Sequence, residues 1–161
     1  MVSQPVRVER VVILGRGGAG KSILARDLRS ATGLPVIELD QEFWTPDLRP
    51  LPPPLWADRQ TVLAAAPRWI MDGDLGPYDE VEPRLRRADT VVILDLPLWL
   101  CAWRAWRRGP ERRDFWIWTV RWRRQSRPGL LRAVADVGPQ AEVVILRSRR
   151  AVRRWLASPA G

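Results

Sequence analysis

Residues 11–22 read VVILGRGGAGKS, an apolar run that leads into a glycine-rich segment ending on lysine and serine. The β-branched run over residues 11–14 is typical of a buried strand. After the lysine, apolar side chains recur at helical spacing up to Gly33, a typical stop signal for a helix. The sequence therefore predicts a strand, a tight glycine-rich turn and a helix over residues 21–32.

The glycine-rich turn has the Walker A spacing of a phosphate-binding loop: Gly15, four residues, then Gly20, Lys21 and Ser22. In such a loop, backbone N–H groups and the N-terminus of the next helix point at phosphate oxygens. The lysine reaches the β- and γ-phosphates, and the serine hydroxyl binds Mg²⁺. We therefore expect ATP and Mg²⁺ to be held by Gly15, Arg16, Gly17, Gly18, Ala19, Gly20, Lys21 and Ser22.

Lys21 is also the only lysine among the 161 residues, since every other basic side chain is arginine. A compact ammonium group fits a narrow phosphate loop, whereas the wide planar guanidinium of arginine does not. The chain therefore keeps lysine at a place where arginine cannot replace it.

Four further apolar runs predict strands, and they alternate with helical patterns. This alternation predicts a three-layer α/β/α fold with a parallel sheet. No internal repeat or long linker divides the chain, so one domain is expected over residues 1–161. The predicted strands cover residues 6–15, 34–40, 68–74, 88–97 and 141–148. The predicted helices cover residues 21–32, 55–66, 98–106, 114–125, 128–137 and 149–158.

The composition excludes several kinds of site. The chain has no histidine and one cysteine, Cys101, which excludes histidine-assisted catalysis, the usual zinc sites and an intrachain disulfide. A formal net charge of +9 favours anionic partners, although an arginine-rich solvated surface gives the same charge. Because no apolar leader, membrane-spanning stretch or coiled-coil pattern is found, we expect a cytoplasmic monomer without a membrane partner.

Three aspartates lie at or near the ends of predicted strands: Asp40, Asp72 and Asp95. Ligands of open α/β sheets bind beyond the carboxyl ends of the strands, so these carboxylates are expected near the phosphate loop. A phosphoryl-transfer site needs one carboxylate for Mg²⁺ and can use another to accept a hydroxyl proton. Helix capping or a place in a solvated loop is the alternative for each of them.

Over nearly its whole length the chain resembles adenylate-kinase-like P-loop kinases, and within them the DNA topology modulation proteins. The resemblance rests on VVILGRGGAGKS, LPVIELDQEFW, RWIMDGD, RLRRADTVVILDLPLWLCAWR, RRQSRPGLL and VVILRSRRAVRRWL. The first segment is common to many nucleotide-binding proteins, whereas "LD…FW", "ADT…LDLP" and "LRS" are more specific. The resemblance implies a five-stranded parallel sheet in the order 2-3-1-4-5.

The resemblance also implies roles for residues outside the loop. Asp72 matches an aspartate that works with Mg²⁺, so it is expected to bind the metal together with Ser22. Asp40 matches an acid that faces the acceptor, as a contact or as a base. Residues 107–127 match a short lid, whose arginines close over the phosphates. The lid candidates are Arg108 and Arg112, with Arg107, Arg113, Arg124 and Arg127; Arg147 borders the adenine and is expected to contact it through the backbone.

One segment departs from this pattern. Monophosphate kinases follow the Asp-Gly pair with Phe-Pro-Arg, whose arginine holds the phosphate of the acceptor, but here Asp74, Leu75 and Gly76 follow. The DNA topology modulation proteins usually carry asparagine where this chain has Asp74. The sequence therefore indicates the phosphate donor and leaves the acceptor open.

The favoured interpretation is a kinase that moves the γ-phosphate of Mg-ATP to a nucleotide or small-molecule acceptor. The alternative is a nucleotide-binding ATPase or regulatory module associated with nucleic acid, without such an acceptor. Residues 115–127, FWIWTVRWRRQSR, offer aromatic stacking faces among arginines and favour the alternative.

Helical spacing gives the tryptophans a simpler role in the core. Trp118 and Trp122 stand at i and i+4, as on the buried face of an amphipathic helix. Trp99, Trp103 and Trp106 have the same kind of spacing, so they are predicted to pack against the sheet.

Overall fold

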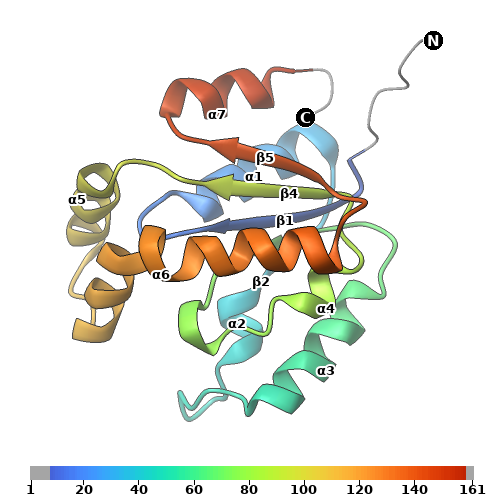
Figure 1. Ribbon diagram of the computed structural model, residues 1–161, viewed down its shortest axis with the longest axis horizontal. Coiled ribbons are helices and arrows are strands. Elements are labelled where there is room, and N and C mark those ends of the chain that lie inside the picture. Colours follow the sequence, from blue (N-terminus) through green and yellow to red (C-terminus); the bar gives the residue numbers. More distant parts are fainter. Residues whose placement is uncertain (1–7, 159–161) are drawn as a thin grey trace.

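The computed structural model describes residues 8–158 and is built on a parallel sheet with helices on both faces (Figure 1). Five strands lie in the order β2-β3-β1-β4-β5, which confirms the predicted fold class and strand order. The central strand β1, Arg10–Gly15, pairs with β3 and β4. The other strands are β2 (Val36–Glu38), β3 (Trp69–Asp72), β4 (Thr90–Leu94) and β5 (Glu142–Leu146).

Helices connect the strands and cover the sheet. In the described region they are α1 (Lys21–Thr32), α2 (Leu39–Phe43), α3 (Pro53–Ala64), α4 (Glu82–Leu85), α5 (Leu98–Arg108), α6 (Arg113–Val137) and α7 (Arg149–Leu156), with a 3₁₀ turn η1 at Gly76–Tyr78. As predicted, α1 ends at Gly33, whose φ of 71° is in the left-handed region. Within residues 8–158, no helix is long and apolar enough to cross a membrane.

Alternating side chains of β1 build two cores, one on each face of the sheet. Val12 and Leu14 pack with residues of α3, α4 and α6. Val11 and Ile13 pack with residues of α1 and α7. Because both faces are covered, the central strands are continuous apolar runs, and the carboxyl end of β1 is held firmly where the glycine-rich loop begins.

Two predicted boundaries differ clearly from the structure. The strand predicted over residues 34–40 ends at Glu38, because the buried Leu39 turns the chain into α2 and carries Asp40 onto that short helix. The predicted restart of a helix at Pro128 is wrong, since α6 runs through it. The start of the first predicted strand, residues 6 and 7, lies outside the described residues.

The predicted burial of the α5 tryptophans is wrong. Trp99, Trp103 and Trp106 are 72%, 47% and 71% exposed. The helix instead buries the small side chains of Cys101 and Ala105 together with a leucine, which lets its backbone come close to the glycine-rich loop. On α6, by contrast, Trp122 is fully buried as predicted, and Trp118 is partly buried against the core.

Candidate functional site

The loop between β1 and α1 needs glycine because of its backbone and its close contacts. Gly18 has a φ of 73° and Gly20 a φ of 92°, both in the left-handed region. A Cβ atom on Gly18 would also lie 2.1 Å from the Cys101 carbonyl oxygen of α5. The first N–H groups of α1 have no acceptor within the helix, so they are free to bind an anion.

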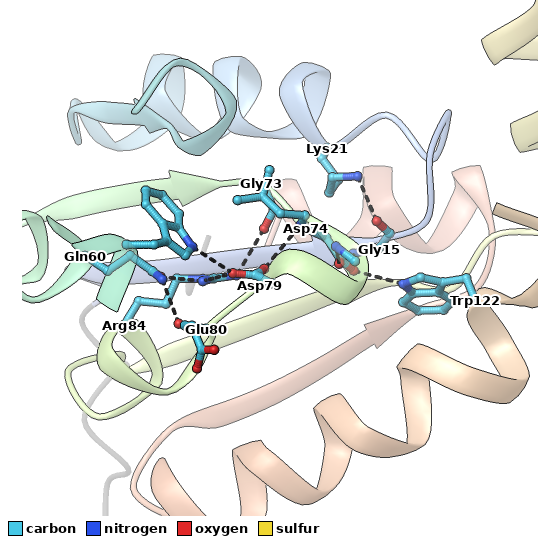
Figure 2. Close-up of polar contacts among 12 residues, drawn as sticks. Gly15, Lys21, Gln60, Gly73, Asp74, Asp79, Glu80, Arg84 and Trp122 are labelled. Atoms are coloured by element: carbon cyan, nitrogen blue, oxygen red, sulfur yellow. Dashed lines mark hydrogen bonds and ion pairs between the residues drawn. The ribbon is translucent and has the colours of Figure 1, made fainter. Parts of the chain in front are cut away.

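Lys21 lies across the mouth of this loop. Its Nζ donates to the Gly15 carbonyl at 2.7 Å (Figure 2) and to the Arg16 carbonyl at 3.2 Å. These two bonds fix the only lysine ammonium of the chain at the first turn of the loop. The arrangement places a positive charge where a bound phosphate would meet the backbone N–H groups.

Asp72 ends β3 next to the loop, paired in register with Ile13 of β1. Burial raises the pKa of its carboxyl, and a hydrogen bond with Ser22 and the charge of Lys21 act against that rise. Its Oδ1 is buried and has no hydrogen-bond partner among the described residues.

A carboxylate oxygen and a serine hydroxyl are the hard oxygen ligands that Mg²⁺ prefers. The pair Ser22 and Asp72 therefore fits this ion. Within residues 8–158 no cluster of three or more acidic, histidine or cysteine side chains could hold a metal. A usual Mg²⁺ site has one or two protein ligands that act together with substrate phosphates and water.

Asp40 lies in the first turn of α2 and lines the same cavity as Lys21 and Asp72. Although the residue as a whole is exposed, loss of hydration raises the pKa of its carboxyl; Lys21 lowers it and Asp72 raises it further. A raised pKa makes a carboxylate a stronger base toward the proton of a hydroxyl group.

Asp74 joins the glycine-rich loop to α6, a role that the sequence did not indicate. Its Oδ2 accepts the Gly15 N–H at 3.3 Å and the Trp122 Nε1–H at 2.9 Å, and its Oδ1 accepts the Gly76 N–H at 3.0 Å (Figure 2). Burial raises the pKa of this carboxyl. Trp122 is 48 positions away, so only the folded chain brings the pair together.

A second buried network, also missed from the sequence, holds the segment after β3. The side chains of Arg84 and Asp79 are 0% and 4% exposed and form an ion pair at 2.5 Å. Arg84 also donates to the Gln60 side chain and, at 3.4 Å, to the Gly73 carbonyl (Figure 2). Nothing in the neighbouring sequence distinguishes Arg84 from the surface arginines.

Asp95 pairs with three arginines, among them the lid candidate Arg127 and Arg147, which was predicted to contact the adenine through its backbone. It forms ion pairs with Arg123 at 2.9 Å, Arg127 at 3.3 Å and Arg147 at 3.9 Å. The side chain of Arg127 therefore lies against this carboxylate and does not line the cavity. The predicted backbone contact of Arg147 stays a prediction. Arg16 is also turned inward: it is 2% exposed, and its guanidinium lies 5.4 Å from the Trp122 ring centre.

The predicted lid comprises the end of α5, a short loop over residues 109–112 and the first part of α6. Arg108 and Arg112 line the cavity, and each is paired with an acid, Glu111 and Asp114 respectively. Arg113 and Arg124 do not line it. Arg104, which the sequence did not single out, does line it and donates to the Ala19 carbonyl at 3.2 Å.

These groups surround one cavity of about 960 Å³. Its floor is the glycine-rich loop with Lys21 and Ser22, and α5 and α6 form one side of it. The loops that follow β2 and β3 form the other side. This volume is large enough for a nucleotide together with a second small molecule.

The chain shares its fold with several solved kinases. Shikimate kinase from Acinetobacter baumannii, solved with shikimate, aligns with a TM-score of 0.61 and 20% identity over 93% of this chain and 89% of that one. A gluconokinase from Sinorhizobium meliloti 1021 aligns with a TM-score of 0.57 and 18% identity, over 94% and 93%. Deoxyadenosine kinase from M. mycoides, solved with dCTP, aligns with a TM-score of 0.54 and 14% identity, over 92% of this chain and 96% of that one.

No family model and no curated protein matches the chain. The resemblance to DNA topology modulation proteins therefore stays a prediction.

Proposed function

We propose that this protein is a kinase that transfers the γ-phosphate of Mg-ATP to a hydroxyl group of a small molecule. The observation that carries the proposal is the meeting of Lys21, the Ser22–Asp72 pair and Asp40 around one cavity. The solved kinases of the same fold, named for shikimate, gluconate and deoxyadenosine, support it as analogues.

In this proposal the glycine-rich loop binds the phosphates of ATP. Its N–H groups and the N-terminus of α1 contact phosphate oxygens, and Lys21 adds a positive charge. Ser22 and Asp72 would hold Mg²⁺, which would neutralise charge that develops on the phosphates. Arg104 lies beside the loop, where it can contact the nucleoside part of ATP.

Asp40 acts as the base for the acceptor. Its carboxylate takes the proton of the acceptor hydroxyl, and the hydroxyl oxygen forms a bond to the γ-phosphorus. The bond between that phosphorus and the β–γ bridging oxygen breaks, and its electron pair leaves with ADP. Arg108 and Arg112 leave Glu111 and Asp114 to bind the transferring group, which would close the lid and exclude water.

Substitution of Lys21 tests the foundation of the proposal. Lys21→Ala removes a charge-assisted contact, so the affinity for ATP, measured by calorimetry, should fall at least about tenfold. Lys21→Arg should also lower the affinity for ATP, because a guanidinium does not fit the loop. Arg153→Ala, on the exposed side of α7, is the control and should bind ATP normally. Unchanged ATP affinity in Lys21→Ala would contradict the proposal.

A second candidate is favoured by the exposure of the α5 tryptophans. Trp99 and Trp106 present free indole faces, and Arg107 stacks 5.0 Å from the ring centre of Trp103. Such a surface suits single-stranded nucleic acid, whose bases stack and whose phosphates meet arginine. A gel shift titrated with salt, with Trp99→Ala and Trp106→Ala, tests it: binding lost at modest salt and unaffected by either substitution reports only the net charge.

A further inference from the structure

Two sides of the cavity differ in charge. Lys21 and an arginine enter it from α1, three arginines enter from α5, and Arg112 enters from the loop before α6. The opposite side comes from the loops after β2 and β3, and we call it the acceptor wall. Its members are Asp40, Trp44, Leu48, Pro50, Asp72, Gly73, Asp74, Leu75, Pro77 and Tyr78.

The acceptor wall presents flat apolar surface. Phe43 is buried, and around it Trp44 packs with ring centres 4.9 Å apart and Tyr78 with ring centres 6.5 Å apart. This contact joins the loop after β2 to the turn after β3. Trp44 and Tyr78 nevertheless remain 38% and 52% exposed on the cavity side, together with Leu48 at 79%. Exposed rings held by a buried one offer a preformed stacking surface.

The same wall carries acidic groups and, among the described residues that line it, no basic one. Arg84 pairs with the buried Asp79, and Arg59 pairs with Glu42 at 2.5 Å. Arg49 follows Leu48 in the chain but does not line the cavity.

A phosphate or carboxylate group on an acceptor would therefore face the carboxylates of the wall. The cations that act on Asp40 are Lys21 and Arg108, and both come from the opposite side of the cavity. Like charges at this range disfavour binding.

Helix α6 closes this part of the cavity from above. Trp118 also lines it, and its indole nitrogen would lie 2.6 Å from a Cβ atom on Gly76, so its ring covers the turn of the acceptor wall directly. With Trp44 and Tyr78, three aromatic side chains border the space next to Asp40. A flat molecule fits such a space better than a branched polar one.

We infer that the acceptor is an uncharged hydroxyl compound with a flat aromatic or apolar body, and that it carries no phosphate or carboxylate. This inference rests on the proposed kinase function. A nucleoside has this chemistry: its base stacks on the aromatic side chains, and its hydroxyl group faces Asp40. The arginines on the opposite side then serve the phosphates of ATP.

The first experiment compares matched acceptors. ADP release from Mg-ATP is measured with nucleosides, with their 5′-monophosphates, and with the hydroxy acids gluconate and shikimate. Nucleosides should exceed the anionic compounds at least about tenfold in kcat/KM. A preference for a monophosphate or hydroxy acid overturns the inference, and so does saturable ATP binding without phosphorylation of any nucleoside. Failure to bind ATP overturns the proposed function itself.

The second experiment tests the wall directly. Trp44→Ala should raise the KM for the nucleoside about tenfold, the scale of one lost stacking contact, and leave ATP affinity unchanged. Trp44→Phe should recover most of that loss. Trp99→Ala, an exposed tryptophan that does not line the cavity, is the matched control. An unchanged KM in Trp44→Ala, with a normal circular dichroism spectrum, contradicts the inference.

A third variant adds the charge that the wall does not have. Pro77 is exposed and lines the cavity, so Pro77→Arg places a cation beside the acceptor with little effect on the core. The ratio of kcat/KM for nucleoside monophosphate over nucleoside should then rise at least about tenfold, as expected for one new arginine–phosphate contact. A ratio that does not move contradicts the assignment of charge to the two sides.

Discussion

Asp74 is a buried carboxylate whose two oxygens accept three hydrogen bonds from three separate parts of the chain. The Asp74 side chain holds the backbone in place. It connects the start of the glycine-rich loop, at Gly15, to the segment after β3 and to Trp122 of α6. These contacts explain why an acid stands at position 74. The asparagine of the DNA topology modulation proteins also carries a side-chain oxygen that can accept a hydrogen bond.

Replacement of Asp74 should therefore destabilise the fold. Asp74→Ala leaves the Gly15 N–H and the Trp122 indole N–H without acceptors in a buried place, which costs about 2–4 kcal/mol of the free energy of unfolding. Urea unfolding followed by circular dichroism measures this. Asp58→Ala, an exposed acid on α3, is the control and should change stability by less than about 0.5 kcal/mol. Equal effects of the two variants would contradict the role of Asp74.

Asp40 should determine how the rate depends on pH. A base works only when deprotonated, and burial raises the pKa of this carboxyl, so kcat should fall on acidification at a higher pH than the value of about 3.9 for a free aspartate would give. Asp40→Asn should lower kcat about 10²–10⁴-fold and abolish this acidic limb, with ATP affinity retained. Asp47→Asn, an exposed acid of the following loop, should leave the profile unchanged. If the pH profile of kcat were the same in Asp40→Asn as in the unmodified protein, Asp40 would not be the base.

At the scale of elements, sequence patterns correctly predicted the features of strands, turns and helix ends that depend on neighbouring residues. The apolar run of β1, the glycine-rich turn and the Gly33 stop are set by neighbouring residues, and all appear where expected. The buried face of α5 was predicted wrongly. Helical spacing shows that the tryptophans share one face of the helix, but it does not show whether that face packs against the sheet. Close approach to Gly18 made the side of Cys101 and Ala105 the buried one.

The continuity of α6 also depends on tertiary packing. Trp122, Leu130 and Val134 are buried along one side of the helix, on both sides of Pro128. Their burial outweighs the backbone hydrogen bond that proline cannot donate to the Arg124 carbonyl. Proline propensity alone therefore predicted a break that the core prevents.

This helix should be open to stabilisation. Gly129 is exposed, lies inside α6, and has no atom within 4 Å of the place of a Cβ atom. Gly129→Ala should raise the free energy of unfolding by about 0.5–1 kcal/mol, because alanine loses less backbone entropy in a helix. Thermal unfolding measures the gain. Gly18→Ala is the opposite control: its Cβ atom would meet the Cys101 carbonyl at 2.1 Å, so it should destabilise. No gain in Gly129→Ala would contradict a regular helix at this point.

At the scale of the whole molecule, the sequence predicted which groups gather at the glycine-rich loop better than it predicted the other contacts around the cavity. Lys21 and Ser22 follow from one motif, and Asp72 joins them because β3 lies next to β1 in the sheet. The Asp79–Arg84 pair and the arginines around Asp95 could not be predicted in this way, because they depend on which charges the packed chain happens to bury together.

The distribution of charge explains why so basic a chain has an acidic acceptor wall. The net charge is +9, yet Asp95 binds several arginines at the carboxyl end of β4 and Asp79 buries another. The basic side chains that do line the cavity lie on the side opposite the acceptor wall. Net charge alone would have suggested an anionic acceptor.

Trp44, Trp103 and Trp118 line the cavity and come from three different segments of the chain. Indole emission is sensitive to its surroundings, so the protein carries its own optical reporter of occupancy. Filling the acceptor side should alter the emission of Trp44, and movement of the lid should alter that of Trp118, which α6 carries. Trp103 lies on α5 beside Arg104, so ATP binding should alter its emission. Single Trp→Phe variants would separate these signals and allow donor binding, acceptor binding and lid closure to be timed by stopped-flow fluorescence without any label.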